Sequence, residues 1–379
     1  MPQLCCPSRA VRGWRLATAL SLLAVVWCGV LPWLGRSPAI QAHIRRNTAQ
    51  GVDPSAKFYT ELEARHRLLT EVDTLRQSHP RAFWVPFHRF AVIGRNDRTE
   101  SIVTSEVPVQ AVRFAGVPAC YAQQLSARGY PIVASGKVNP CALREAAYIV
   151  DLMLEDRADV RNAMIKSGSR LCILAWNEFT TDLPEWEHLK RAAVPGFPGA
   201  SPRDYWDARA RGLGGSETDP YCSCGEENLL GYPGDPYAAE NILIHEFAHN
   251  IHLRGMVNLD PTFDLRLQET YRAAVNAGLW QGTYASVNHH EYFAEGAQSW
   301  FDDNRVHDHD HNHVHLRSQL IAYDPGLAAI CREVFGDRAR RYTRPATRLV
   351  DHLAAYDPAQ APTFVWPQRL QAVKSLIDR

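Results

Sequence analysis

The stretch HEFAHNIH, residues 245–252, places three histidines and one glutamate within eight positions. Apolar residues before and between these polar ones predict a half-buried helix, namely Ile242, Leu243, Ile244, Phe247, Ala248 and Ile251. On a helix, His245 and His249 lie on one face, one turn apart, so their imidazoles can bind the same zinc ion. Glu246 beside them can act as general base on a water molecule whose pKa the zinc lowers to about 7. The stretch predicts a catalytic zinc helix rather than an ordinary surface helix.

The third protein ligand is not obvious from the stretch itself. His252 follows His245 by seven residues and stays near the same helix face, but one straight helix rarely supplies three ligands to a tetrahedral centre. The pattern HExxHxxGxxH solves this problem with a glycine and a later histidine. Here His252 stands at the glycine position and Gly255 at the position of the last histidine. We therefore predict that His252 packs near the site without binding the metal.

A second polar motif lies downstream in SVNHHEYFAEGAQSWF, residues 286–301. Glu291 and Glu295 are four residues apart on a helical pattern, and a carboxylate from a second helix can complete a zinc site. We predict that Glu291 is the third ligand and that Glu295 hydrogen-bonds a liganding histidine. Two alternatives stay open: both acids face solvent, or His289 or His290 is the ligand.

HEFAH followed by TYASVNHHEYFAE resembles the gluzincin metallopeptidases related to the catalytic domain of anthrax lethal factor and to the Pro-Pro endopeptidases. In that family a tyrosine follows HExxH by some forty residues, and six further residues lead to E-[FY]-F-A-E; Tyr284 and the motif at residues 291–295 match. The resemblance implies His245, His249 and Glu291 as zinc ligands and Glu246 as the base. It implies that the Tyr284 hydroxyl stabilises the tetrahedral intermediate, and that the fold is α+β and zincin-like, with a small mixed sheet.

The resemblance is strongest over residues 240–295 and extends more weakly over 115–335. We assign residues 115–379 to the catalytic domain. Its patterns predict strands near 130–138 and 169–179, helical structure between them, and helices at 236–253, 261–279, 290–302 and beyond 325. Asp235 and Pro236 suit the start of the first of these helices. Residues 184–236 are rich in glycine and proline and predict either a loop at the rim of the active site or an ordinary surface loop.

The N-terminal part reads differently. Residues 1–42 contain three early arginines, Arg9, Arg12 and Arg15, which precede an apolar run at 16–34. Small residues follow the run, and no acidic residue occurs before Asp53. This pattern predicts a signal peptide or an N-terminal membrane anchor, and therefore a secreted or otherwise extracytoplasmic protein. Residues 43–114 carry a helical pattern at 54–79 and strand-like segments near 83–94 and 102–115, typical of an accessory or pro-region. Six cysteines follow residue 42, enough for three disulfides in an exported chain.

The segment VHDHDHNHVH, residues 306–315, has a histidine at every second position: His307, His309, His311, His313 and His315. An extended strand would place all five on one side. The segment predicts either a polar surface loop or a second, weaker metal site.

Together these features predict a zinc metalloendopeptidase that acts on a protein or peptide. The formal net charge is zero, which argues against nucleic acid as a partner. Two other functions remain open: a hydrolase of non-peptide amides, and a catalytically silent zinc-binding interaction protein.

Overall fold

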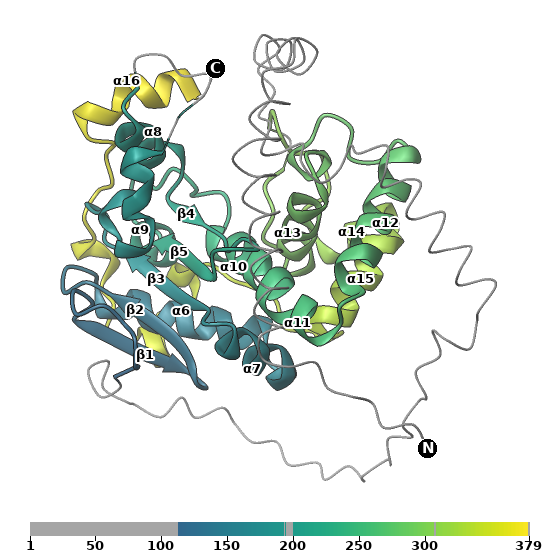
Figure 1. Ribbon diagram of the computed structural model, residues 1–379, viewed down its shortest axis with the longest axis horizontal. Helices are drawn as coiled ribbons and strands as arrows, with labels where there is room; N and C mark the ends of the chain where they lie inside the picture. The colour runs from purple at the N-terminus through teal and green to yellow at the C-terminus, as the bar shows by residue number, and fades with distance from the viewer. Residues whose placement is uncertain (1–112, 193, 195–199, 307, 378–379) are drawn as a thin grey trace, which may run out of the picture. The chain divides into compact units, whose positions relative to one another are not determined.

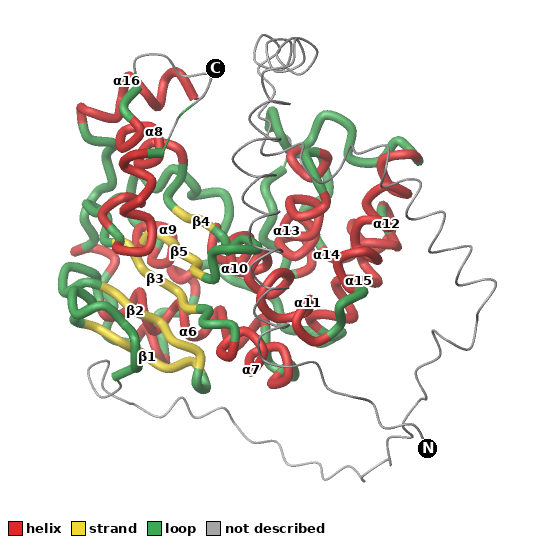
Figure 2. Tube along the Cα trace, viewed as in Figure 1, coloured by secondary structure: helices red, strands yellow, loops and turns green. Residues whose placement is uncertain are grey.

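The computed structural model describes residues 113–192, 194, 200–306 and 308–377, which belong to one compact unit. The predicted signal or anchor at 1–42 and the predicted elements at 54–79 and 83–94 lie outside the described residues, as does nearly all of 102–115. No helix in the described part of the chain is long and apolar enough to cross a membrane. The fold is mixed α+β, with one small sheet and many helices (Figures 1 and 2).

The sheet has five strands in the order β1-β2-β3-β5-β4. They are β1 (Gln123–Ala127), β2 (Tyr130–Ala134), β3 (Arg170–Leu174), β4 (Gly212–Leu213) and β5 (Tyr221–Gly225). β2, β3 and β5 run parallel, while β1 and β4 are antiparallel to their neighbours. Arg128 and Gly129, both with positive φ, make the two-residue turn between β1 and β2. The predicted small mixed sheet is therefore present.

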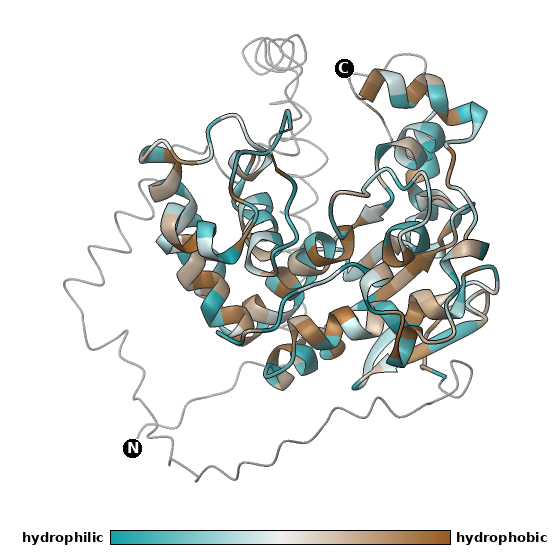
Figure 3. Cartoon of the chain, turned by 180° about the vertical axis from the view of Figure 1, so that it is seen from behind, coloured by the Kyte–Doolittle hydropathy of each residue, from teal (hydrophilic) through white to brown (hydrophobic). Residues whose placement is uncertain are grey.

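The three central strands are buried on both faces, because side chains alternate along each strand. One face, with Ile132, Leu171, Ile173, Cys222 and Cys224, belongs to the main core. The other face packs in a smaller cluster of Tyr121, Val133, Cys172, Leu174, Leu183 and Trp186. The strands are accordingly mostly brown in Figure 3.

The helices that follow β2 and β3 agree in part with the sequence predictions. The stretch between those strands forms α6 (Pro140–Met153) and α7 (Ala158–Lys166). The predicted helices at 261–279 and 290–302 correspond to α12 (Phe263–Asn276) and α13 (His289–Trp300). Beyond residue 316 the chain forms α14 (Arg317–Tyr323), α15 (Pro325–Phe335) and α16 (Gln368–Ile377).

The predicted glycine- and proline-rich loop at 184–236 contains regular structure, and that prediction was incomplete. A 3₁₀ segment (Pro184–Arg191), α8 (Pro202–Arg209) and α9 (Glu226–Leu230) lie in it, as do strands β4 and β5. The β5 sequence YCSCG lacks the Val and Ile residues that mark strands, and its burial between β3 and β4 overrides that weak propensity.

All six cysteines in the described part of the chain are free thiols. Five are buried and Cys120 is exposed. Burial raises the pKa of the Cys222 and Cys224 thiols well above the ordinary value, so they stay neutral at physiological pH. The cysteines therefore serve as small core residues, and the three disulfides that the count permits are not formed.

The helix that carries HEFAH starts later than predicted. Helix α10 runs from Ile242 to Asn250, and Asn241 caps it by accepting a hydrogen bond from the Leu243 amide. Asp235 instead accepts from the Tyr237 amide, which makes a tight turn. The Asn228 side-chain amide donates to three oxygens of this segment, on Asp235, Tyr237 and Glu240, and holds it out of a helix. This buried amide is the reason that an Asp-Pro start signal fails here.

Candidate metal centre

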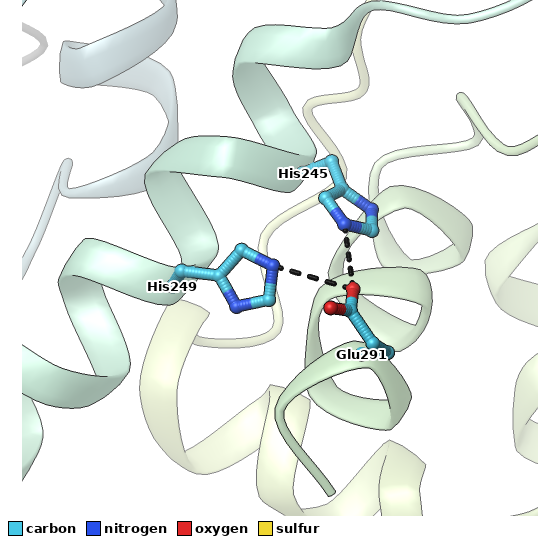
Figure 4. Close-up of side chains that lie close together, drawn as sticks. All are labelled: His245, His249 and Glu291. Carbon is cyan, nitrogen blue, oxygen red and sulfur yellow. Dashed lines mark hydrogen bonds and ion pairs between the residues drawn. The ribbon is translucent and has the colours of Figure 1, made fainter. Parts of the chain in front are cut away.

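Helix α10 and helix α13 pack directly against each other, and the candidate site lies on their facing sides. His245 and His249 project from α10 and Glu291 from the first turn of α13 (Figure 4). The Asn288 side chain caps α13 by accepting hydrogen bonds from the His290 and Glu291 amides. Gly296 allows α15 to approach α13 closely, because a Cβ there would lie 2.7 Å from Leu327. Capping and packing thus fix the turn that carries Glu291.

One carboxylate oxygen of Glu291 lies between the two imidazoles. Its Oε2 atom is 3.1 Å from Nε2 of His245 and 3.4 Å from Nε2 of His249. Ligand-type atoms of the three residues all lie within 4.8 Å of one another, and no other His, Cys, Asp or Glu group in the described part of the chain meets this condition. Two imidazole nitrogens and a carboxylate form a donor set suited to zinc. The three side chains therefore fit a zinc ion.

The pKa values of Glu291 and Glu246 agree with the roles predicted for them, which are metal ligand and general base. Burial acts to raise the pKa of Glu291, but His249 and His245 outweigh it and hold that pKa well below its usual range. Glu291 is therefore an ionised ligand. Burial raises the pKa of Glu246, while His245 and His249 oppose the rise. A carboxylate with a raised pKa is a better proton acceptor, as a general base requires.

Strand β4 and the glycines after it run along α10 on the side of Glu246. A Cβ on Gly212 would lie 3.0 Å from the Glu246 Cγ atom, and a Cβ on Gly214 would lie 2.7 Å from the His249 ring. The Gly214 backbone acts to lower the pKa of Glu246, which also places this glycine beside the carboxylate. Part of the glycine-rich stretch therefore borders the site, as one of the two interpretations of residues 184–236 predicted.

Tyr284 lies in a short 3₁₀ turn (Tyr284–Ser286) before α13, with its ring centroid 6.0 Å from that of His245. Burial and the charge of Glu291 raise its pKa to about 12, while His245 and Arg209 oppose the rise. The hydroxyl therefore remains protonated at neutral pH and can donate a hydrogen bond. The structure thus places Tyr284 beside the three ligand residues.

His252 faces away from the metal ligands. It lies at the start of a π-helical segment, Ile251–Met256, that follows α10. Its Nε2 atom is 3.0 Å from Asp264 Oδ1, and Nε2 of His289 is 2.9 Å from the same oxygen. The His290 ring stacks near those of His289 and His252. His252, His289 and His290 thus form a separate buried cluster.

Glu295 lies behind His245, but a residue that the sequence analysis missed is nearer. Glu295 Oε1 is 3.4 Å from His245 Nδ1, whereas Oε1 of Gln298 is 2.9 Å from that nitrogen. Gln298 follows Glu291 by seven residues and Glu295 by three, so the helical spacing could have indicated it. A glutamine attracts less notice than an acid, although its amide oxygen accepts the same hydrogen bond.

The histidine-rich segment does not gather its side chains at a second metal site. His309 is 81% exposed, His311 is buried, the His313 ring packs edge-to-face against Tyr323, and His315 contacts the His313 carbonyl. His307 lies outside the described residues. The described histidines point to different partners because the segment folds into turns rather than an extended strand.

Arg209 is a second residue that the sequence analysis missed. It ends α8, three residues before Gly212, and its exposed guanidinium donates to the Tyr205 hydroxyl. Burial acts to lower the pKa of Arg209, but Tyr205, Tyr284 and Glu291 outweigh it and raise that pKa. No carboxylate forms an ion pair with Arg209 in the described part of the chain. An arginine on a glycine-rich stretch carries no sequence signal of its own.

Comparison with known proteins gives one structural likeness to report. The Pro-Pro endopeptidase of Paenibacillus alvei is similar to this chain with 18% sequence identity and a TM-score of 0.38, over 54% of this chain and 97% of that one. No protein-family model matches the chain. No curated protein matches it either.

The ligand set can be tested by metal analysis. We expect Glu291→Ala and His249→Ala to lose zinc during dialysis against a weak chelator, because two remaining ligands hold the ion poorly. His252→Gln should keep about one zinc per chain, since Nε2 of His252 contacts Asp264 and does not join the three candidate ligands. Zinc retained by Glu291→Ala, or lost from His252→Gln with the fold intact, would place the third ligand elsewhere.

Proposed function

We propose that this protein is a zinc metallopeptidase in which His245, His249 and Glu291 hold the metal. The observation that carries the proposal is the convergence of two imidazole nitrogens on one Glu291 oxygen, with Glu246 beside them on the same helix. A zinc ion bound there would polarise a peptide carbonyl and lower the pKa of a water molecule to about 7.

Glu246 acts as the general base in this proposal. It takes a proton from the attacking water and passes it to the leaving amine. The raised pKa of its carboxylate suits both steps. Tyr284 donates its hydroxyl proton in a hydrogen bond to the oxygen on which negative charge develops. Both residues favour catalysis over a purely structural zinc site, which has no use for a base or a hydroxyl donor.

Strand β4 favours a peptide over a small amide as substrate. It is the last strand in the sheet and is hydrogen-bonded only to β5 among the described strands, beside Glu246. An extended peptide can add to such an edge through main-chain hydrogen bonds, which places a backbone carbonyl near the metal ligands. Export from the cytoplasm stays a prediction of residues 1–42.

Replacing the base should separate metal binding from hydrolysis. We expect Glu246→Gln to bind zinc like the wild type and to cleave a peptide library roughly 10² to 10⁴ times more slowly, because the amide cannot accept the proton. Glu269→Gln, the same change at an exposed position of α12, serves as the control. Undiminished cleavage by Glu246→Gln would refute the mechanism. Cleavage of small amides but of no peptide would favour the non-peptide alternative.

Removal of the Tyr284 hydroxyl should affect the chemical step. We expect Tyr284→Phe to lower kcat roughly 10²-fold, with KM and zinc content unchanged, because one hydrogen bond to the developing oxyanion is lost. Steady-state kinetics on a single cleaved peptide measure both constants. A raised KM at unchanged kcat would show instead that Tyr284 binds the substrate in its ground state.

Arg209 should favour substrates with an acidic residue near the cleaved bond, because it is an exposed cation without a carboxylate partner. We expect Arg209→Gln to reduce the preference for acidic over neutral peptides by up to about fivefold, as for an exposed ion pair, whereas Arg209→Lys retains it. The preference should also weaken at high salt. Equal selectivity in wild type and Arg209→Gln would remove Arg209 from substrate recognition.

A further inference from the structure

We propose that the segment Asp308–His311 of the histidine-rich stretch is a support for the metal centre, and that His311 is a positioning residue for the ligand His245. The inference builds on the proposed zinc site but does not depend on the substrate. It assigns a role to a segment that the sequence analysis left as either a surface loop or a second metal site.

The first link runs from His311 to His245 through Glu295. The His311 side chain is only 3% exposed, and its Nε2 atom is 3.3 Å from Glu295 Oε2. The other oxygen of Glu295 is 3.4 Å from Nδ1 of His245. Asn304 donates a further hydrogen bond to Glu295 Oε2 at 3.0 Å. Glu295 is therefore held on one side by the loop and faces the metal ligand on the other.

The same nitrogen of His245 is held by a second route. Gln298 Oε1 is 2.9 Å from it, and the Gln298 amide nitrogen donates to Glu240 at 2.7 Å, which fixes the orientation of the amide. Two oxygen atoms at Nδ1 favour the proton on that nitrogen, which leaves the lone pair of Nε2 for the metal when zinc is bound. Hydrogen bonds of this kind tighten metal binding because they fix both tautomer and ring orientation.

The two routes close into a ring. Glu240 Oε1 is 3.1 Å from Arg305 Nε, and a guanidinium nitrogen of Arg305 is 3.2 Å from Asp308. Asp308 in turn lies 2.7 Å from Nδ1 of His311. Each carboxylate in the ring faces a basic side chain. Loss of His311 would leave Glu295 without its loop partner.

A second link joins the segment to Tyr284. The Tyr284 amide donates a hydrogen bond of 2.8 Å to the Asp310 carbonyl. The Asp308 carboxylate accepts a hydrogen bond of 2.9 Å from the Asp310 amide and also contacts His311. These two contacts stabilise the turn at residues 308–311. The same four residues therefore contact the tyrosine turn on one side and Glu295 on the other. This double attachment is what a solvent loop would lack.

The test compares two histidines of the same segment. His311 is buried against Glu295, whereas His309 is 81% exposed and faces only Asp310. We expect His311→Ala in the full chain to lower zinc affinity roughly ten- to a hundredfold, the range for loss of a residue that orients a ligand, and His309→Ala to leave it unchanged. Competition with a chromophoric chelator measures the affinity without any substrate, so failure of peptide cleavage would not affect the result.

A conservative variant guards against loss of the fold. His311→Gln keeps one donor nitrogen, while its amide oxygen cannot donate to a carboxylate, so it can serve Glu295 or Asp308 but not both in the manner of His311, and its zinc affinity should lie between those of wild type and His311→Ala. Circular dichroism and the melting temperature of the metal-free proteins report folding. Wild-type affinity in both His311 variants would overturn the proposal. An equal loss in His309→Ala would overturn it too, because the effect would then belong to the loop in general.

Discussion

The contact between α10 and α13 is the constraint on which the site depends. Neither helix holds three ligands, so the metal centre exists only where the two helices meet and a Glu291 oxygen enters between His245 and His249. Apolar packing sustains that contact, with α10 against the sheet and α13 against α15. Hydrophobic burial thus fixes the spacing of polar atoms to the accuracy that coordination chemistry requires.

Sequence reasoning was effective where a pattern has one physical meaning. The i, i+4 spacing of His245 and His249 specifies a shared helix face, and the spacing of Glu291 and Glu295 specifies another. Periodicity also identified α12, α13 and the buried strands β2 and β3. That α10 and α13 pack together could be expected only from the chemistry of the motif and the family resemblance.

Predictions failed where tertiary contacts decide local structure. The side chain of Asn228, seven or more residues away, suppresses a helix start at Asp235 and Pro236. The contact of His252 with Asp264, which keeps it out of the group of candidate ligands, has no simple sequence signature. Strand β5 is made of residues with weak strand preference, and it is a strand because it pairs with β3. Gln298 was not predicted because a neutral amide carries no charge, although its oxygen accepts a hydrogen bond as a carboxylate does.

The glycines beside α10 limit how this protein could change its specificity. At Gly214 and Gly215 any side chain would collide with His249 or Asn250, so this wall of the site must stay bare backbone. Bare backbone recognises main chain and is blind to side-chain identity. In the proposed peptidase, discrimination among substrates would therefore fall to other margins of the site, such as α8, whose side chains are not among the candidate metal ligands. Selectivity could thus diverge between related chains while the reaction itself stays the same.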